Sequence, residues 1–179
     1  MFTIRYKIIH DEFVDYRTID LCDFETNHGD IEGSLELCFH DKTVGFLDDD
    51  FPAIPEWLVV WFRDLLTVSL YLLSHDYVAY KLPEASRIWL EFKRSGDDLI
   101  VSLVEDVPRE EITNHFIVEP LGEFQKSDWS GVRIKREQFL REIIDQTEGF
   151  LEEIRTINPC LLQSTALQKL MGLKEDCKK

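Results

Sequence analysis

The sequence predicts an α+β fold, in which a mainly antiparallel sheet packs against a buried central helix, about residues 55–74, and an amphipathic C-terminal helix, about residues 136–157. Three observations point to this class: a long apolar run in mid-chain, strand-like patterns on both sides of it, and a helical pattern near the carboxyl end. The chain has 179 residues, of which 44% are hydrophobic, enough to bury one core. We therefore predict a single domain over residues 1–179.

Strands are expected before the central helix. The segment 34–40 alternates apolar and polar residues, which is typical of a half-buried strand, and 43–46 follows as its partner. The segments 2–9 and 17–24 contain several residues with high β-propensity. We therefore predict two further strands there.

The central helix is predicted from the run WLVVWFRDLLTVSLYLL, residues 57–73. Its apolar side chains recur at helical spacing around most of the circumference, as in buried helices. Arg63 and Asp64 fall near the middle, where each charge would cost about 2.5–3.5 kcal/mol in a membrane. We expect a core helix that leaves Arg63 and Asp64 on a narrow polar strip, and no membrane association.

A strand at 77–82 and a hairpin at 86–106 are predicted after this helix. The hairpin turn is placed at Gly96-Asp97, a dipeptide suited to a two-residue turn. Because side chains alternate between the two faces of a strand, this turn puts Trp89 on the face opposite the core. On the core face, the predicted cross-strand pairs are Phe92 with Val101 and Leu90 with Leu103.

The carboxyl part is expected to be helical. Residues 136–157 carry an apolar stripe at helical spacing, and 160–172 predict a short closing helix with Gly172 just beyond its last turn. Residues 173–179 are expected to be a frayed tail. Residues 106–131 are expected to form a long loop that contains one short strand.

Cysteine usage and the amino end indicate the compartment. The four cysteines are widely scattered and form no CxxC pair, which argues against a zinc site and for a reducing environment. Arg5 and Lys7 interrupt the apolar residues at the start of the chain, unlike a secretory signal. We therefore expect a cytoplasmic protein with no metal and no cofactor.

The formal net charge of −15 is unevenly distributed: residues 1–60 hold 14 acids against 4 bases. Such a surface would repel a phosphate backbone, which disfavours direct nucleic-acid binding. It would steer a basic protein partner toward itself. The expected partner-binding residues are Asp48, Asp49 and Asp50, together with Asp30 and Glu32.

Tryptophans could also contribute to such an interface. Trp89 and Trp129 have no obvious place in the predicted core, so each is either covered by the carboxyl helix or exposed as a binding hot spot. We include Trp89 among the candidate partner-binding residues.

Two alternatives use other features of the chain. Glu91 and Lys93 share one face of a predicted strand, as in the Glu-x-Lys half of a metal-dependent nuclease site, although such a site also needs an upstream acid. A small metal-dependent hydrolase is therefore one alternative. A homo-oligomeric structural or scaffold protein is the other, because the sequence leaves the oligomeric state open. Catalytic signatures such as GxSxG, HExxH or a Gly-rich phosphate loop are absent.

The whole profile resembles the immunity proteins of bacterial polymorphic-toxin systems. The resemblance rests on the strand-rich amino half, the Trp-bearing helix, the SGDD hairpin at 95–98 and the amphipathic carboxyl helix, in a small acidic chain. It implies a non-enzymatic, stoichiometric inhibitor that covers the basic active site of a cognate toxin, often a nuclease. It assigns no role to any single residue.

Overall fold

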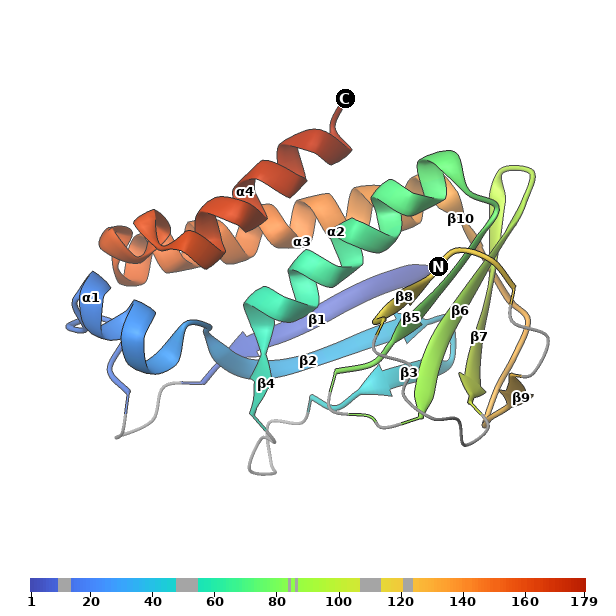
Figure 1. Cartoon of the computed structure of the whole chain (residues 1–179), viewed down its shortest axis with the longest axis horizontal. Coiled ribbons are helices and arrows are strands. Elements are labelled where there is room, and N and C mark those ends of the chain that lie inside the picture. Colours follow the sequence, from blue (N-terminus) through green and yellow to red (C-terminus); the bar gives the residue numbers. More distant parts are fainter. Residues whose placement is uncertain (10–13, 48–54, 84, 86, 107–113, 121–123) are drawn as a thin grey trace.

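The α+β class is confirmed by the computed structural model, which describes residues 1–9, 14–47, 55–83, 85, 87–106, 114–120 and 124–179 (Figure 1). The strands of the described ranges form two antiparallel sheets. The first contains β1 (Phe2–Ile8), β2 (Glu32–Phe39), β3 (Lys42–Gly45) and β4 (Glu56–Trp57), in the order β1-β2-β3 with β4 also paired to β2. The second contains β5 (Tyr77–Lys81), β6 (Ile88–Ser95), β7 (Asp98–Glu105), β8 (Phe116–Ile117), β9 (Gln125–Lys126) and β10 (Val132–Lys135). Its order is β10-β7-β6-β5-β8, and β9 pairs with β7.

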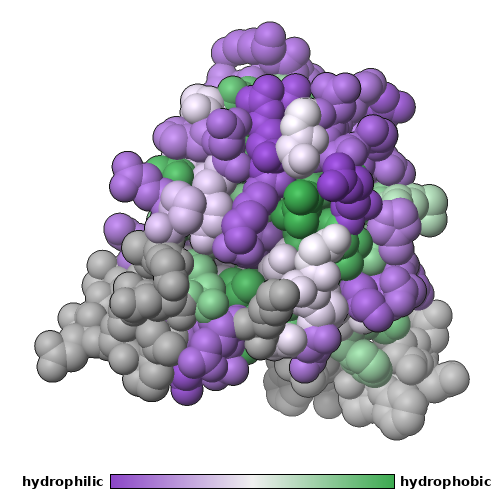
Figure 2. All heavy atoms as spheres, turned by 90° about the vertical axis from the view of Figure 1, so that its right-hand side faces the viewer, coloured by the Kyte–Doolittle hydropathy of each residue, from purple (hydrophilic) through white to green (hydrophobic). Residues whose placement is uncertain are grey.

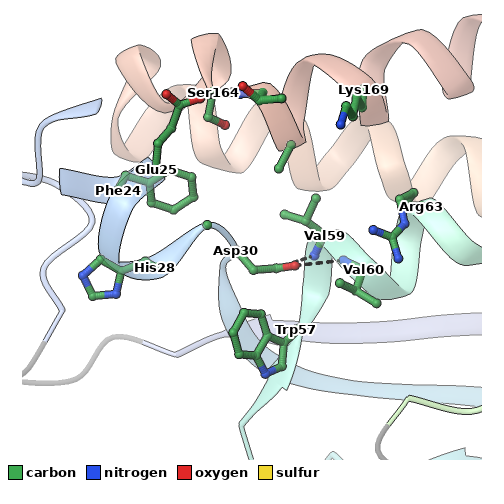
Figure 3. Close-up of a pocket in the computed structure, with 13 residues that line it drawn as sticks. Phe24, Glu25, His28, Asp30, Trp57, Val59, Val60, Arg63, Ser164 and Lys169 are labelled. Carbon is green, nitrogen blue, oxygen red and sulfur yellow. Dashed lines mark hydrogen bonds between the residues drawn. The ribbon is translucent and has the colours of Figure 1, made fainter. Parts of the chain in front are cut away.

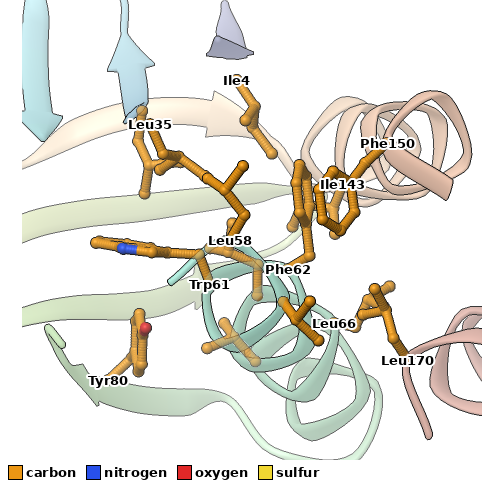
Figure 4. Close-up of a cluster of buried hydrophobic side chains, with 14 of the residues drawn as sticks. Ile4, Leu35, Leu58, Trp61, Phe62, Leu66, Tyr80, Ile143, Phe150 and Leu170 are labelled. Carbon is orange, nitrogen blue, oxygen red and sulfur yellow. The ribbon is translucent and has the colours of Figure 1, made fainter. Parts of the chain in front are cut away.

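The helices lie together on one side of the strands (Figure 1). They are α1 (Leu21–Asp23), the π-helical turn η1 (Phe24–His28), α2 (Leu58–Ser74), α3 (Arg136–Ile157), the 3₁₀ helix η2 (Pro159–Gln163) and α4 (Thr165–Cys177). The core fills the space between these helices and the sheets (Figure 4). At its centre, Phe62 of α2 stacks on Phe150 of α3 with ring centroids 4.9 Å apart, and meets Tyr6 of β1 edge-on at 5.3 Å.

The central helix is confirmed as a core element, with two corrections. It begins at Leu58 rather than near 55, so Trp57 precedes it and is 45% exposed. Asp64 does not lie on a polar strip, because only 2% of it is exposed. Arg63 beside it is exposed and binds Asp64 through Nε and Nη2, each 2.9 Å from Oδ1. This ion pair offsets part of the cost of burying the Asp64 carboxylate, although burial still raises its pKa.

The hairpin has the predicted register. Phe92 pairs with Val101 and Leu90 with Leu103, and Gly96 takes a φ of 62° in the turn. Because a one-residue slip would move every core side chain to the other face, burial holds this register in place.

Trp89 was predicted to be either covered by the carboxyl helix or exposed as a hot spot, and the structure shows neither. Trp89 is 1% exposed, but the carboxyl helix does not cover it. Its cover is Phe124, whose ring centroid lies 5.6 Å away, on the outer face of the second sheet. Trp129 is also buried and packs against Phe39 at 5.5 Å.

Two predictions, one for residues 17–24 and one for residues 173–179, are wrong. Residues 17–24 do not form a strand: Asp20 accepts a hydrogen bond from the Asp23 N–H and so begins α1. The tail at 173–179 is not frayed, since α4 continues through Gly172 to Cys177. Cys177 is buried against α2, where its thiol contacts the Leu66 carbonyl oxygen at 3.6 Å. Tertiary contact thus extends the helix beyond its local stop signal.

The segment 106–131, predicted as a long loop with one short strand, contains two short strands within its described residues. It contributes β8, close to the strand expected there, and also β9. β10, which directly precedes α3, was not predicted, because its four residues are too short a run to show a pattern.

Candidate functional site

The predicted acidic surface is only partly within the described residues. Asp48, Asp49 and Asp50 lie outside them. Glu32 is half-buried on β2, where it faces Trp57 of β4 in the antiparallel register. Asp30 is not a surface charge, because only 5% of it is exposed. The prediction that Asp30 belongs to the exposed partner-binding acids is therefore wrong.

Asp30 instead caps the amino end of α2. The Val59 N–H donates to Oδ1 at 2.8 Å, and the Val60 N–H donates to Oδ2 at 3.0 Å (Figure 3). Trp57 holds the N-cap position but makes no capping bond with its side chain. A carboxylate from a residue far earlier in the chain therefore satisfies N–H groups that a local Ser, Thr or Asp usually satisfies.

Burial raises the pKa of Asp30 to about 6, and the hydrogen bonds from Val59, Ile31 and Val60 only partly offset that rise. The loss of hydration is thus the dominant effect on this carboxyl. Asp30 is consequently a structural group whose protonation changes in mildly acidic solution.

Trp89 is also removed from the candidate interface, since it is buried under Phe124. The exposed large aromatic side chains of the described residues are Phe46, 50% exposed, and Trp57, 45% exposed. The sequence predicts a buried position for Trp57, because this residue continues the helical spacing of the apolar side chains of α2. Its position one residue before the helix turns it away from the core.

Phe46 and Trp57 both lie beside the edge of β2 that is not paired with β1, and we call this pair the aromatic edge. The Phe46 N–H donates to the Leu35 carbonyl oxygen at 3.1 Å, and Trp57 pairs with Glu32, three residues away on β2. In the sequence, the two aromatic residues bracket the acidic stretch that contains Asp48, Asp49 and Asp50. Exposed aromatic side chains are enriched at protein–protein interfaces.

A cavity of about 510 Å³ is lined in part by Trp57 (Figure 3). Three segments build it: the turn at 24–30, the first two turns of α2, and the beginning of α4. Glu25 ties the first segment to the third, because its Oε1 accepts from the Thr165 N–H at 2.7 Å and from the Thr165 hydroxyl at 2.9 Å. Arg63 and Lys169 face the cavity from α2 and α4.

The opposite end of the molecule is different in character. Figure 2 shows a largely hydrophilic face there, with hydrophobic side chains gathered in a small central area. Leu73, in the last turn of α2, is 54% exposed and lines a hollow of about 150 Å³ between α2 and α3.

Glu91 and Lys93 do share a strand face, as predicted, and they form an ion pair of 2.8 Å. Glu91 also accepts a hydrogen bond from the Tyr77 hydroxyl at 3.2 Å, so its carboxylate already has two partners. Within the described ranges, no group of three or more His, Cys, Asp or Glu residues could hold a metal ion.

The chain matches no protein-family profile, no curated protein and no solved structure. Among the helices that the structure describes, none has the length and apolar character needed to cross a membrane.

Proposed function

We propose that this chain is a non-enzymatic protein-binding domain that holds a basic partner, in the manner of an immunity protein that neutralises a toxin. The observation that carries the proposal is the aromatic edge, Phe46 and Trp57, whose two exposed residues bracket the acidic triplet in the sequence of a chain of net charge −15. The aromatic side chains supply apolar contact area, and the acids attract the partner.

The two parts of this surface have different physical roles. Exposed acids act over roughly a Debye length, about 8 Å at physiological salt, so they mainly accelerate encounter. Aromatic side chains act only in contact, and their burial mainly slows dissociation. Glu32, which pairs with Trp57, and Glu56, which precedes it, bring acidic side chains close to the aromatic edge.

A basic active site that normally binds phosphates fits such a surface. Carboxylates can occupy the positions of those phosphates, and close charge pairs across an interface can be net favourable. The partner class we propose is therefore a protein with a basic cleft, of which a nuclease toxin is the leading case.

The first test identifies and measures the partner. The full chain is immobilised, a lysate of its native host is passed over it at low salt, and bound protein is eluted with a salt gradient. We expect one basic protein retained near one-to-one. With that protein purified, Asp48, Asp49 and Asp50 are changed together to Asn. We expect association to slow by about tenfold at low salt, with a flatter salt dependence.

A second variant, Phe46→Ser with Trp57→Ser, should speed dissociation and cost about 2 kcal/mol or more of binding free energy. The matched control for charge is Glu137→Gln, Glu148→Gln and Glu152→Gln on α3, which makes the same change in net charge. The control for apolar exposure is Leu73→Ser. Unchanged kinetics in the aspartate variant, or equal effects in the controls, would remove the aromatic edge and its acids from the interface.

A further inference from the structure

The cavity beside Trp57 has a size that suits a small molecule. Its volume of about 510 Å³ falls within the range of ligand pockets, roughly 300–1,000 Å³. Three segments far apart in the sequence form its walls, and the Glu25–Thr165 and Asp30–α2 hydrogen bonds hold those segments together (Figure 3). Hydrogen bonds between the three segments therefore hold the walls of the cavity in place.

The acids that line the cavity are already engaged. Asp30 accepts from the first N–H groups of α2, and Glu25 accepts from the first N–H and hydroxyl groups of α4. Each carboxylate lies at the positive end of a helix dipole, which offsets much of its charge. Asp30 is thus not open to a ligand cation, and Glu25, which is exposed, has one of its two oxygens engaged.

The basic residues, in contrast, keep unused donors. Arg63 has five N–H donors, and its two bonds to Oδ1 of the buried Asp64 leave three for other acceptors. Asp64 also restrains the Arg63 guanidinium, because the buried carboxylate is itself fixed by packing and binds two of the guanidinium nitrogens. Lys169 is exposed and has no hydrogen-bond or ion-pair partner within the described ranges. Both cations face the cavity in Figure 3.

The remaining lining is mostly apolar, with His28, Ser164 and Thr165 as its polar members. Trp57 presents its half-exposed indole on one side, and Val59, Val60 and Ala166 contribute apolar surface. An indole face of this kind stacks on flat ring systems. The lining thus joins a donor-rich end to an apolar wall.

We propose that this cavity binds a small organic oxyanion, a phosphate ester or a carboxylate with a flat ring. Arg63 and Lys169 hold the anionic group, and the ring lies against Trp57. The site is separate from the proposed partner surface in its chemistry, although Trp57 borders both. Its test does not depend on the identity of any protein partner.

The test uses the full chain and nuclear magnetic resonance of the tryptophan indole N–H groups. The chain has four tryptophans, and a Trp57→Phe variant assigns the Trp57 signal. Adenosine monophosphate and 2-naphthoate are the two anionic probes, each titrated to about 10 mM to reach weak sites. Adenosine and inorganic phosphate are the matched probes that lack the charge or the ring.

We expect at least one anionic probe to shift the Trp57 signal in a saturable way and the matched probes to bind more weakly. Which anionic probe binds distinguishes a phosphate from a carboxylate site. Lys169→Glu should weaken binding by about tenfold or more. Lys179→Glu makes the same charge change two residues beyond the far end of α4 and should leave binding unchanged.

Three results would each overturn the proposal. One is a Trp57 signal that neither anionic probe moves. Another is that adenosine monophosphate binds but adenosine binds just as tightly, and the last is equal affinity of the two lysine variants for the anionic probe that binds. Lys169 has no partner among the described side chains, so we expect the Lys169→Glu variant to fold normally, and its thermal unfolding midpoint verifies this.

Discussion

Replacing Asp30 with alanine is expected to lower the free energy of unfolding by about 2–4 kcal/mol at pH 6. The N–H groups of Val59 and Val60 would lose their acceptor at a buried helix end, 2.8 Å and 3.0 Å from the missing oxygens. The measurement is chemical denaturation followed by circular dichroism. Asp20→Ala is the control, since Asp20 caps only the three-residue α1 and should cost less.

Asp30 also predicts a pH dependence of stability. Its pKa in the folded protein is about 6, above the value near 3.9 of an unfolded aspartate. The folded state therefore binds more protons than the unfolded state between these values, and stability falls as pH rises from 4 to about 6.5. The contribution is about 3 kcal/mol.

The Asp30→Asn variant isolates this contribution. Asparagine keeps one acceptor oxygen but carries no charge, so its unfolding free energy should change less over the same pH range. Burial also raises the pKa of Asp64, but Asp64 is present in both proteins and largely cancels in the comparison. Parallel pH profiles for the two proteins would refute the assignment of a raised pKa to Asp30.

Replacing Gly33 with alanine is the other substitution with a large expected effect, about 2–4 kcal/mol of lost stability. A Cβ at this position would lie 2.5 Å from the Lys7 carbonyl oxygen and closer still to Cδ1 of Leu58. The carbonyl belongs to the neighbouring strand and Leu58 is fully buried, so neither can move aside cheaply. The glycine lets the first turn of α2 approach β2.

Gly172→Ala is the matched control for this change. Gly172 lies inside α4, and a Cβ there would meet no atom within 4 Å. Alanine should therefore stabilise the protein by up to about 1 kcal/mol through its higher helix propensity. If Gly33→Ala proved as harmless as Gly172→Ala, the close approach of α2 to β2 would be wrong. The Gly33 variant should also shift the Trp57 indole signal, because α2 carries one wall of the cavity.

Local patterns were sufficient for much of the fold. The Gly96-Asp97 turn and the alternation around it predicted the β6–β7 register residue by residue, because burial on one face excludes a slipped pairing. The α3 boundaries at 136 and 157 also follow from the apolar stripe over these residues. Such features depend on neighbours within a few residues along the chain.

The candidate sites depend on contacts between distant parts of the chain, which the sequence pattern does not contain. Asp30 reads as one acid among many, yet it caps a helix that begins 28 residues later. Trp57 continues the helical stripe of α2 in the sequence, but it precedes the helix and is exposed. Trp89 faces away from the main core, but it is buried under Phe124.

By itself, the sequence determined the fold class, the two long helices, the central hairpin and the acidic character, since periodicity and composition are local properties. The tertiary structure alone decided which polar groups are buried, which tryptophan is exposed, and that Arg63 and Lys169 meet across one cavity. The physical reason is that burial and electrostatics depend on which surfaces pack together, and that choice is made by the whole chain.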